Sequence, residues 1–125
     1  MPAKVVKKRI LVIEDEKPLA RALELKLVHE GFEVLGAANG EIAISLLTSD
    51  KFSLVICDLI MPKVDGFQVL EFIRDQKIKT PVIILTNLSQ SEDEKRVRAL
   101  GASEFFVKSN TSILKIIEHV KEKVS

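Results

Sequence analysis

The sequence predicts an α/β fold, a doubly wound five-stranded parallel sheet with strand order 2-1-3-4-5 and helices on both faces. Two observations predict it: short apolar runs recur five times, and a segment with helical spacing of apolar residues follows each run. Parallel strands need crossover connections, and this alternation supplies a helix for each crossover. At 125 residues with 46% hydrophobic side chains, we expect one compact domain over residues 1–125.

Five apolar runs predict buried strands, because a strand that is covered on both faces is apolar without alternation. A short basic stretch precedes the first run, and we expect residues 1–8 to form a flexible basic arm. Contact of this arm with a phosphate backbone is the less favoured alternative, since short terminal charge runs are usually solvated. The predicted strands span residues 10–13, 32–38, 54–57, 82–85 and 105–107.

Amphipathic helices are predicted between and after these runs, because apolar residues recur there three and four positions apart. Segment 91–98 is nearly all polar with a thin apolar face, so we expect its helix to be loosely held. Ser91 and Glu94 fit a capping box at its start. The other four helices have their apolar positions at Leu19, Leu23 and Leu27; Ala43, Leu46 and Leu47; Phe67, Leu70 and Ile73; and Ile113, Ile116, Ile117, Val120 and Val124.

Polar residues directly follow four of the five runs. In a parallel sheet, ligands bind beyond the carboxyl ends of the strands, where the strand order reverses. The second run ends in Ala37, Ala38 and Asn39 and supplies no ligand, which fits a site between the first and third strands. Carboxylates crowded at this edge repel one another, so a cation is expected, and hard oxygen ligands suit Mg²⁺. The polar residues are Glu14, Asp15, Glu16, Asp58, Thr86 and Lys108.

These residues lie in runs that resemble the receiver domains of bacterial two-component response regulators. The most specific run, Asp58-Leu-Ile-Met-Pro-Lys-Val-Asp-Gly66, combines a carboxylate at a strand end, a turn directed by proline and a glycine that opens the next helix. The resemblance covers nearly the full chain and implies the flavodoxin-like receiver fold. The other matching runs are residues 10–16, Thr86, residues 101–102 and residues 107–108.

By this resemblance, Asp58 accepts a phosphoryl group from the phosphohistidine of a histidine kinase or phosphotransfer protein. Asp15, Asp58 and the backbone carbonyl of Ile60 are implied as ligands of Mg²⁺. Glu14 is implied to act mainly through a metal-bound water. The metal offsets the charge that develops on the phosphoryl oxygens in a loose, in-line transfer.

Three further residues take roles from the resemblance. Lys108 is expected beside Asp58 and then beside a phosphoryl oxygen; at about 4 Å and an effective dielectric of about 20, the Coulomb attraction is roughly 4 kcal/mol before desolvation. Thr86 is expected to donate its hydroxyl to a phosphoryl oxygen and to couple that shift to an aromatic residue. Phe105 occupies the matching position, and plain core packing is an equally good interpretation of it, because Phe106 must face the other side of the strand.

Partner binding is the implied output of phosphorylation, which adds about −1.5 to −2 charge and shifts an inactive-to-active equilibrium. The implied readout surface is the fourth predicted helix, the fifth strand and the fifth helix. A downstream effector or output domain is the expected partner, and a phosphorylation-induced homodimer is another form that this readout can take.

Three positions depart from the family pattern. Ser109 follows Lys108 where most receivers have proline in a cis peptide, and a cis bond before a residue other than proline costs about 2.5 to 4 kcal/mol. Asn87 follows Thr86 where a small residue is usual, and Glu14 is one methylene longer than the common aspartate. None of these changes removes the nucleophile, a metal ligand or the lysine.

Ile60 and Leu88 occupy positions that, in the family, influence how water reaches the acyl phosphate. Both side chains are bulky and apolar, and neither can orient a water molecule. We therefore expect slow self-dephosphorylation.

Composition bounds the location and the partners. A net charge of +1 offers no global attraction to nucleic acid or anionic lipid, so we expect neither direct nucleic-acid binding nor membrane association. Cys57 is the only cysteine, and residues 1–9 lack the apolar run of a signal peptide, so a cytoplasmic location is expected. No stretch approaches membrane-spanning length.

Alternative functions remain open at this point. A phosphatase with Asp58 as nucleophile needs a second acid two residues on, where Ile60 stands, so we expect only self-directed phosphotransfer rather than an enzyme. A flavodoxin-like cofactor site is disfavoured, because residues 14–16 repel phosphate. The stronger rival is a receiver-like interaction module that does not cycle phosphate, which Ser109 and Asn87 keep open.

Overall fold

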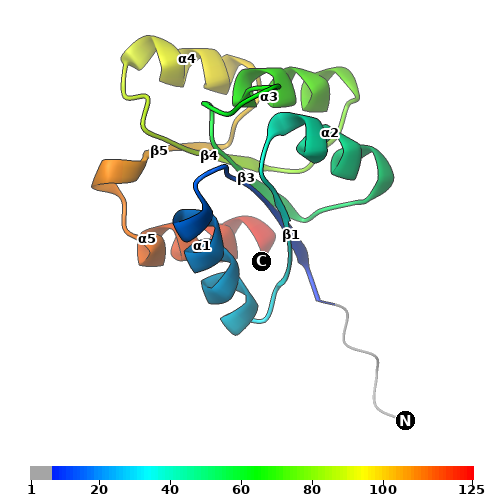
Figure 1. Ribbon diagram of the computed structural model, residues 1–125, viewed down its shortest axis with the longest axis vertical. Helices are drawn as coiled ribbons and strands as arrows, with labels where there is room; N and C mark the ends of the chain where they lie inside the picture. The colour runs from blue at the N-terminus through cyan, green and yellow to red at the C-terminus, as the bar shows by residue number, and fades with distance from the viewer. Residues whose placement is uncertain (1–6) are drawn as a thin grey trace.

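The structure of the protein is a computed structural model, which describes residues 7–125 (Figure 1). Strands and helices alternate along the described chain, as the apolar runs predict. The elements are β1 (Arg9–Ile13), α1 (Lys17–His29), β2 (Glu33–Ala37), α2 (Gly40–Ser49), β3 (Leu54–Cys57), α3 (Gly66–Asp75), β4 (Val82–Thr86), α4 (Ser91–Ala99), β5 (Glu104–Val107), the 3₁₀ helix η1 (Lys108–Asn110) and α5 (Ile113–Val124).

The five strands form one parallel sheet in the order β2-β1-β3-β4-β5, which confirms the predicted topology. β1 lies between β2 and β3, and Ile13 at its carboxyl end pairs with Ala37 on one side and Cys57 on the other. The order of the strands therefore reverses at the β1–β3 pair: β2 is added on one side of β1, and β3, β4 and β5 are added on the other. A ligand site is expected just beyond the carboxyl ends of these two strands.

The helices cover the sheet in two layers (Figure 1). α1 and α5 pack on one face, where Leu23, Leu27 and Ile116 are buried against Ile10 and Ile56. α2, α3 and α4 cover the other face, and their buried residues form a second cluster with Leu11, Ile13, Val55, Cys57 and Ile84. Alternate residues of a strand point to opposite faces, so β1 and β3 each contribute to both clusters.

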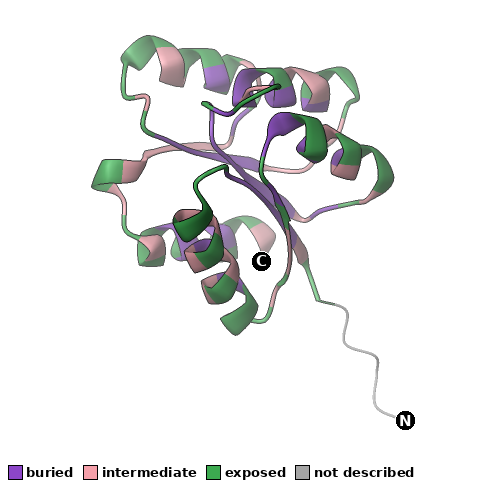
Figure 2. Ribbon diagram, in the orientation of Figure 1, coloured by how far each residue is buried: buried purple, intermediate pink, exposed green. Residues whose placement is uncertain are grey.

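Burial of the strands follows their position in the sheet (Figure 2). β1, β3 and β4 are buried almost throughout. β2 and β5 are edge strands, and most of their residues are only partly buried or exposed. The prediction that all five strands are buried is therefore wrong for these two, because an edge strand has a neighbour on one side only.

The helix starts differ from the prediction at α4. Its N-cap is Gln90 with no side-chain hydrogen bond, and Ser91 is the first helical residue, so the predicted capping box of Ser91 and Glu94 is absent. A capping box occurs instead on α3, where Asp65 accepts from the Gln68 amide at 2.9 Å and the Gln68 side chain accepts from the Asp65 amide at 3.0 Å.

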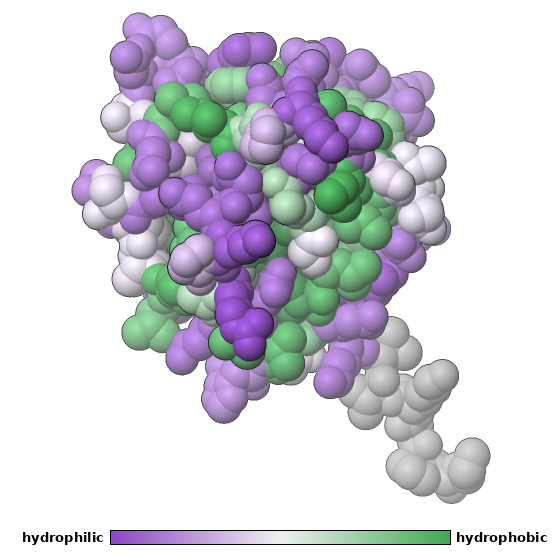
Figure 3. All heavy atoms as spheres, in the orientation of Figure 1, coloured by the Kyte–Doolittle hydropathy of each residue, from purple (hydrophilic) through white to green (hydrophobic). Residues whose placement is uncertain are grey.

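α4 is attached by few apolar contacts, as predicted. Val97 is its one buried residue, and Arg96 adds a cation–π contact, with its guanidinium carbon 3.9 Å from the centre of the Phe67 ring on α3. Hydrophilic side chains cover its outer side, at the top left of Figure 3. This helix is therefore the one that a small change in free energy can displace most easily.

The predicted basic arm of residues 1–8 lies mostly outside the described residues, which begin at Lys7. Lys8 is held rather than free, because its carbonyl accepts from the Glu33 amide at 3.0 Å and its ammonium group donates to the Val124 carbonyl. The arm, as far as it is described, is attached at its last residue.

Candidate functional site

Three carboxylates meet at the carboxyl ends of β1 and β3. Glu14 and Asp15 follow β1, and Asp58 follows β3, whose last residue pairs with Ile13. Backbone hydrogen bonds extend the sheet by one residue on each side: the Asp58 amide donates to the Ile13 carbonyl and the Glu14 amide to the Ala37 carbonyl, both at 3.0 Å. One oxygen from each of the three carboxylates lies within 4.8 Å of the other two.

Lys108 reaches this cluster from the end of β5. Its ammonium nitrogen lies 2.8 Å from Oδ2 of Asp58, 2.9 Å from Oε1 of Glu14 and 2.9 Å from Oε2 of Glu16. The side chains of Lys108, Glu14 and Asp58 are 10%, 3% and 5% exposed, whereas that of Glu16 is 53% exposed. A single cation therefore contacts three acids, two of them buried.

The pKa values in this cluster reflect burial and mutual charge. Burial raises the pKa of Glu14 to about 7, and the charge of Asp58 adds to this effect, against the lowering influence of the Glu16 amide and Lys108. Burial alone lowers the pKa of Lys108, but the hydrogen bonds to Asp58, Glu14 and Glu16 more than offset it, so that pKa lies above its ordinary value. Lys108 is therefore fully charged at neutral pH.

The loop after Asp58 is folded tightly over the Asp58 carboxylate. Oδ1 of Asp58 accepts from the Leu59 amide at 2.7 Å and, more weakly, from the Ile60 amide at 3.4 Å. Gly66 closes the loop, with its amide donating to the Leu59 carbonyl at 2.9 Å. A Cβ atom at Gly66 would lie 2.1 Å from the Asp58 carbonyl oxygen, so only glycine fits there.

The two residues expected to act as a switch lie beside the site. Thr86 ends β4 and is fully buried, and its hydroxyl accepts from the Leu88 amide at 3.3 Å. Phe105 of β5 is partly buried and packs against the cluster that contains Cys57, whereas Phe106 packs on the opposite face. This arrangement confirms that the two phenylalanines face opposite sides of the sheet.

Cys57 points away from the acidic residues into the core, as its place before Asp58 on a buried strand predicts. Burial raises the pKa of its thiol well above the ordinary value. His119 lies in the middle of α5, where its ring meets Phe106 edge-on with the ring centres 4.8 Å apart. All peptide bonds in residues 7–125 are trans, including the one between Lys108 and Ser109.

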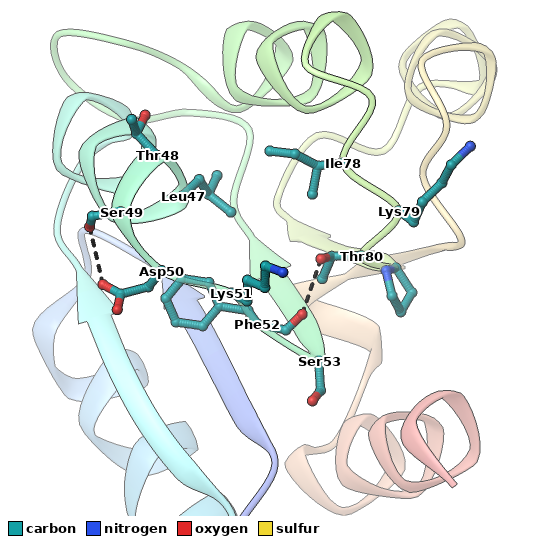
Figure 4. A pocket seen from close by; sticks show the side chains of 11 residues that line it. Leu47, Thr48, Ser49, Asp50, Lys51, Phe52, Ser53, Ile78, Lys79 and Thr80 are labelled. Carbon is teal, nitrogen blue, oxygen red and sulfur yellow. Dashed lines mark hydrogen bonds between the residues drawn. The ribbon is translucent and has the colours of Figure 1, made fainter.

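Two hollows lie at opposite ends of the sheet. A pocket of about 180 Å³ opens over the Asp58 carboxylate, lined by Asp15, Glu16, Asp58, Ile60, Asn87 and Lys108. A wider one of about 660 Å³ lies beneath the amino ends of β3 and β4 (Figure 4). Two of its hydroxyls bond locally, Ser49 to Asp50 and Thr80 to the Phe52 carbonyl.

Glu16 is a site residue whose role the sequence pattern does not indicate. The sequence places it after the first apolar run, but the carboxylate's contact with Lys108 joins residues 92 positions apart. The available signal was the Glu-Asp-Glu run itself, since a third acid beside two metal-binding candidates needs a counter-charge of its own.

The arrangement fits a divalent cation. Three carboxylate oxygens at mutual distances below 4.8 Å supply the hard donors that Mg²⁺ prefers, and the 180 Å³ pocket beside them leaves room for water ligands.

Among residues 7–125, no helix is both long and apolar enough to pass through a membrane.

The protein is thus an α/β domain with a doubly wound parallel sheet, and a carboxylate cluster and a lysine lie at the switch point where ligands bind in such folds. Residues 10–121 match the response regulator receiver domain, and the chain belongs to this family.

Relatives agree with this assignment. A probable transcriptional regulator ycf27 of Porphyridium aerugineum is 41% identical over 82% of this chain, and the regulatory protein PhoP for alkaline phosphatase synthesis of Bacillus subtilis is 33% identical over 81%. The chain spans only 42% of the length of each of these two proteins.

Solved structures show the same fold. The receiver domain of Francisella response regulator 1452 superposes with a TM-score of 0.89 at 29% identity, covering 94% of this chain and 97% of that one. TrrA of Thermotoga maritima, in complex with Mg²⁺ and BeF, superposes with a TM-score of 0.82 at 36% identity, covering 93% and 98% of the two chains.

Proposed function

We propose that this domain is a phosphoacceptor switch, in which Asp58 receives a phosphoryl group with the help of Mg²⁺ and the modified domain changes its partner binding. The observation that carries the proposal is the 2.8 Å contact between Lys108 and Asp58 beside a carboxylate cluster suited to a cation. Membership of the receiver family supports the same function.

The transfer needs one nucleophile and a neutralised pocket. An oxygen of the Asp58 carboxylate attacks phosphorus, an O–P bond forms, and the P–N bond to the donor histidine breaks. The leaving imidazole keeps the bonding electron pair and takes a proton from solvent. Lys108 is placed to donate to a phosphoryl oxygen, since its ammonium group already touches Asp58.

Mg²⁺, when bound, neutralises charge on the phosphoryl oxygens. Glu14, Asp15 and Asp58 supply the side-chain oxygens around it, and the Ile60 carbonyl completes the proposed set. TrrA, which is 36% identical to this chain, has been solved with Mg²⁺ and BeF, which supports this choice of metal.

The proposed readout begins at Thr86. Without a phosphoryl group, the Thr86 hydroxyl accepts from the Leu88 amide. When this hydroxyl donates to a phosphoryl oxygen, the Thr86 side chain turns toward Asp58 and leaves space beside β5 for Phe105. The weakly packed α4 lies next to β5 and responds to this shift. The surface of α4, β5 and α5 is thus the proposed binding face for an output domain, an effector or a second copy.

The donor in this proposal is a histidine kinase or phosphotransfer protein. The relatives ycf27 and PhoP are longer transcriptional regulators. We therefore propose that this domain controls the activity of an output domain. The domain turns over no external substrate. The single buried cysteine suits a reducing compartment and supports a cytoplasmic location.

Hydrogen exchange tests the switch against its rival, an interaction module that does not cycle phosphate. Wild-type protein and the Asp58→Asn variant are compared with Mg²⁺ alone and with Mg²⁺ plus beryllofluoride, a phosphoryl mimic. We expect exchange in α4, β5 and α5 to change with the mimic in the wild type only. Binding of the mimic without any change on this face would contradict the switch and favour the rival.

A further inference from the structure

Glu16 occupies an unusual position for a glutamate at a helix start. It is the N-cap residue of α1, yet its side chain accepts no hydrogen bond from the helix amides. Its carboxylate turns instead to Lys108, 2.9 Å away, and its own amide donates to Oε2 of Glu14 at 3.0 Å. The Glu16 carboxylate thus contacts Lys108 instead of capping α1.

Lys108 has no hydrogen-bonding capacity left in this state. An ammonium group has three donors, and its contacts to Asp58, Glu14 and Glu16 use all three. A phosphoryl group on Asp58 needs one of these donors, so the new contact must replace one of the three present contacts.

Glu16 is the carboxylate that leaves at the lowest cost. Its side chain is 53% exposed, so water hydrates it once it is released, whereas those of Glu14 and Asp58 are 3% and 5% exposed. It also lines the 180 Å³ pocket into which the phosphoryl group enters, where its negative charge faces an incoming anion.

We propose that Glu16 is a positioning residue that competes with the phosphoryl group for Lys108, so that forming the acyl phosphate breaks the Lys108–Glu16 ion pair. Glu16 thereby restrains the lysine before transfer and opposes occupancy of the pocket by an anion. This inference rests on the proposed function, because it assumes that the phosphoryl group occupies Asp58.

Equilibrium binding of beryllofluoride at saturating Mg²⁺ tests the inference. Amide chemical shifts report how much of the protein has bound the mimic. Glu16→Gln removes the charge and keeps the shape. Glu16→Asp keeps the charge on a side chain one methylene shorter. Glu41→Gln is the matched control, because Glu41 is an exposed acid in the first turn of α2.

We expect Glu16→Gln to bind the mimic about two- to fivefold more tightly than wild type at low salt, the range that one half-exposed ion pair supports. The difference should shrink in 0.5 M NaCl by about half or more, because salt screens exposed pairs. Glu16→Asp should lie between Glu16→Gln and wild type, and Glu41→Gln should match wild type. Urea midpoints of all variants show whether the fold is retained.

Equal or weaker binding by Glu16→Gln, in a variant with the wild-type urea midpoint, would overturn the role of Glu16 and leave the proposed function intact. A tighter Glu41→Gln would overturn it as well, since any lost negative charge would then suffice. If wild type itself does not bind the mimic, the proposed function fails, and this inference fails with it.

Discussion

The ammonium group of Lys108 lies 2.8 Å from Oδ2 of Asp58, although the two residues are 50 positions apart in the chain. The order of the sheet creates this contact, because β3 and β5 flank β4 and both end at the same edge. The two buried members of the cluster, Glu14 and Asp58, depend on the same lysine. We therefore expect the charge balance at this edge of the sheet to couple stability to the binding of a divalent cation.

Replacing Lys108 by glutamine leaves three carboxylates without their cation. We expect the free energy of unfolding in EDTA to fall by about 3 kcal/mol, since removing one partner of a buried ion pair costs roughly 3 to 5 kcal/mol and one of these acids is half exposed. Mg²⁺ should recover most of the loss, because it supplies the missing positive charge. Urea unfolding with and without Mg²⁺ measures both quantities, with Lys51→Gln as an exposed control. An equal loss in both conditions would show that charge balance is not the cause.

Stability in EDTA should depend on the protonation of Glu14. Its pKa is raised from an ordinary 4.5 to about 7, so the folded state holds this proton more tightly than the unfolded state. The corresponding contribution to stability is complete below pH 4.5, falls as the pH rises to 7 and is flat above that, a change of up to about 3 kcal/mol. Urea unfolding from pH 4.5 to 8, for wild type and Glu14→Gln, measures it as the difference between the two curves. Parallel curves would contradict the raised pKa.

The phosphoryl group should be lost slowly because Ile60 blocks water without orienting it. The Ile60 side chain lines the pocket and is 57% exposed, so a replacement there is tolerated by the fold. We expect Ile60→Asn to speed the loss of the acyl phosphate by about two- to tenfold, less than the 10² that a true general base supplies. The decay of phosphorylated protein, followed by intact mass, gives the rate. Ile42→Asn, at another exposed isoleucine, should decay like wild type; a slower Ile60→Asn would refute this account.

Gly66 is required by the backbone of the loop that follows Asp58. A methyl group there would meet the Asp58 carbonyl at 2.1 Å, so Gly66→Ala must push the loop away from Asp58. We expect a loss of about 1 to 3 kcal/mol in stability, the usual cost of overpacking, together with reduced acceptance of phosphate from acetyl phosphate. Gly31→Ala is the control: its φ of 97° makes alanine strained, but no atom lies within 4 Å and the site is untouched. If both variants accept phosphate equally per folded molecule, Gly66 has no role in the site.

The fold and most of the site were predictable from local patterns. Alternating apolar runs and helical spacings define the sheet, and the rule for strand ends selects Asp15, Asp58 and Lys108 without long-range information. The burial of β2 and β5 was not predictable in this way, because it depends on which strands lie at the edges. The N-cap of α4 at Gln90 differs by one residue from the predicted Ser91, since both fit the same polar stretch. The Glu16–Lys108 contact depends on side-chain directions at opposite ends of the chain, which no local pattern encodes.

Acceptance of a phosphoryl group by Asp58 is tested most directly by intact mass. Wild-type protein and Asp58→Asn are incubated with acetyl phosphate and Mg²⁺ over time, with an EDTA control; mass is the natural readout because the chain has neither tryptophan nor tyrosine. A single phosphoryl adduct on the wild type, absent from Asp58→Asn and absent in EDTA, is the predicted result. An adduct of equal yield on Asp58→Asn, or one that forms equally in EDTA, would contradict the assignment of Asp58 as the metal-dependent acceptor.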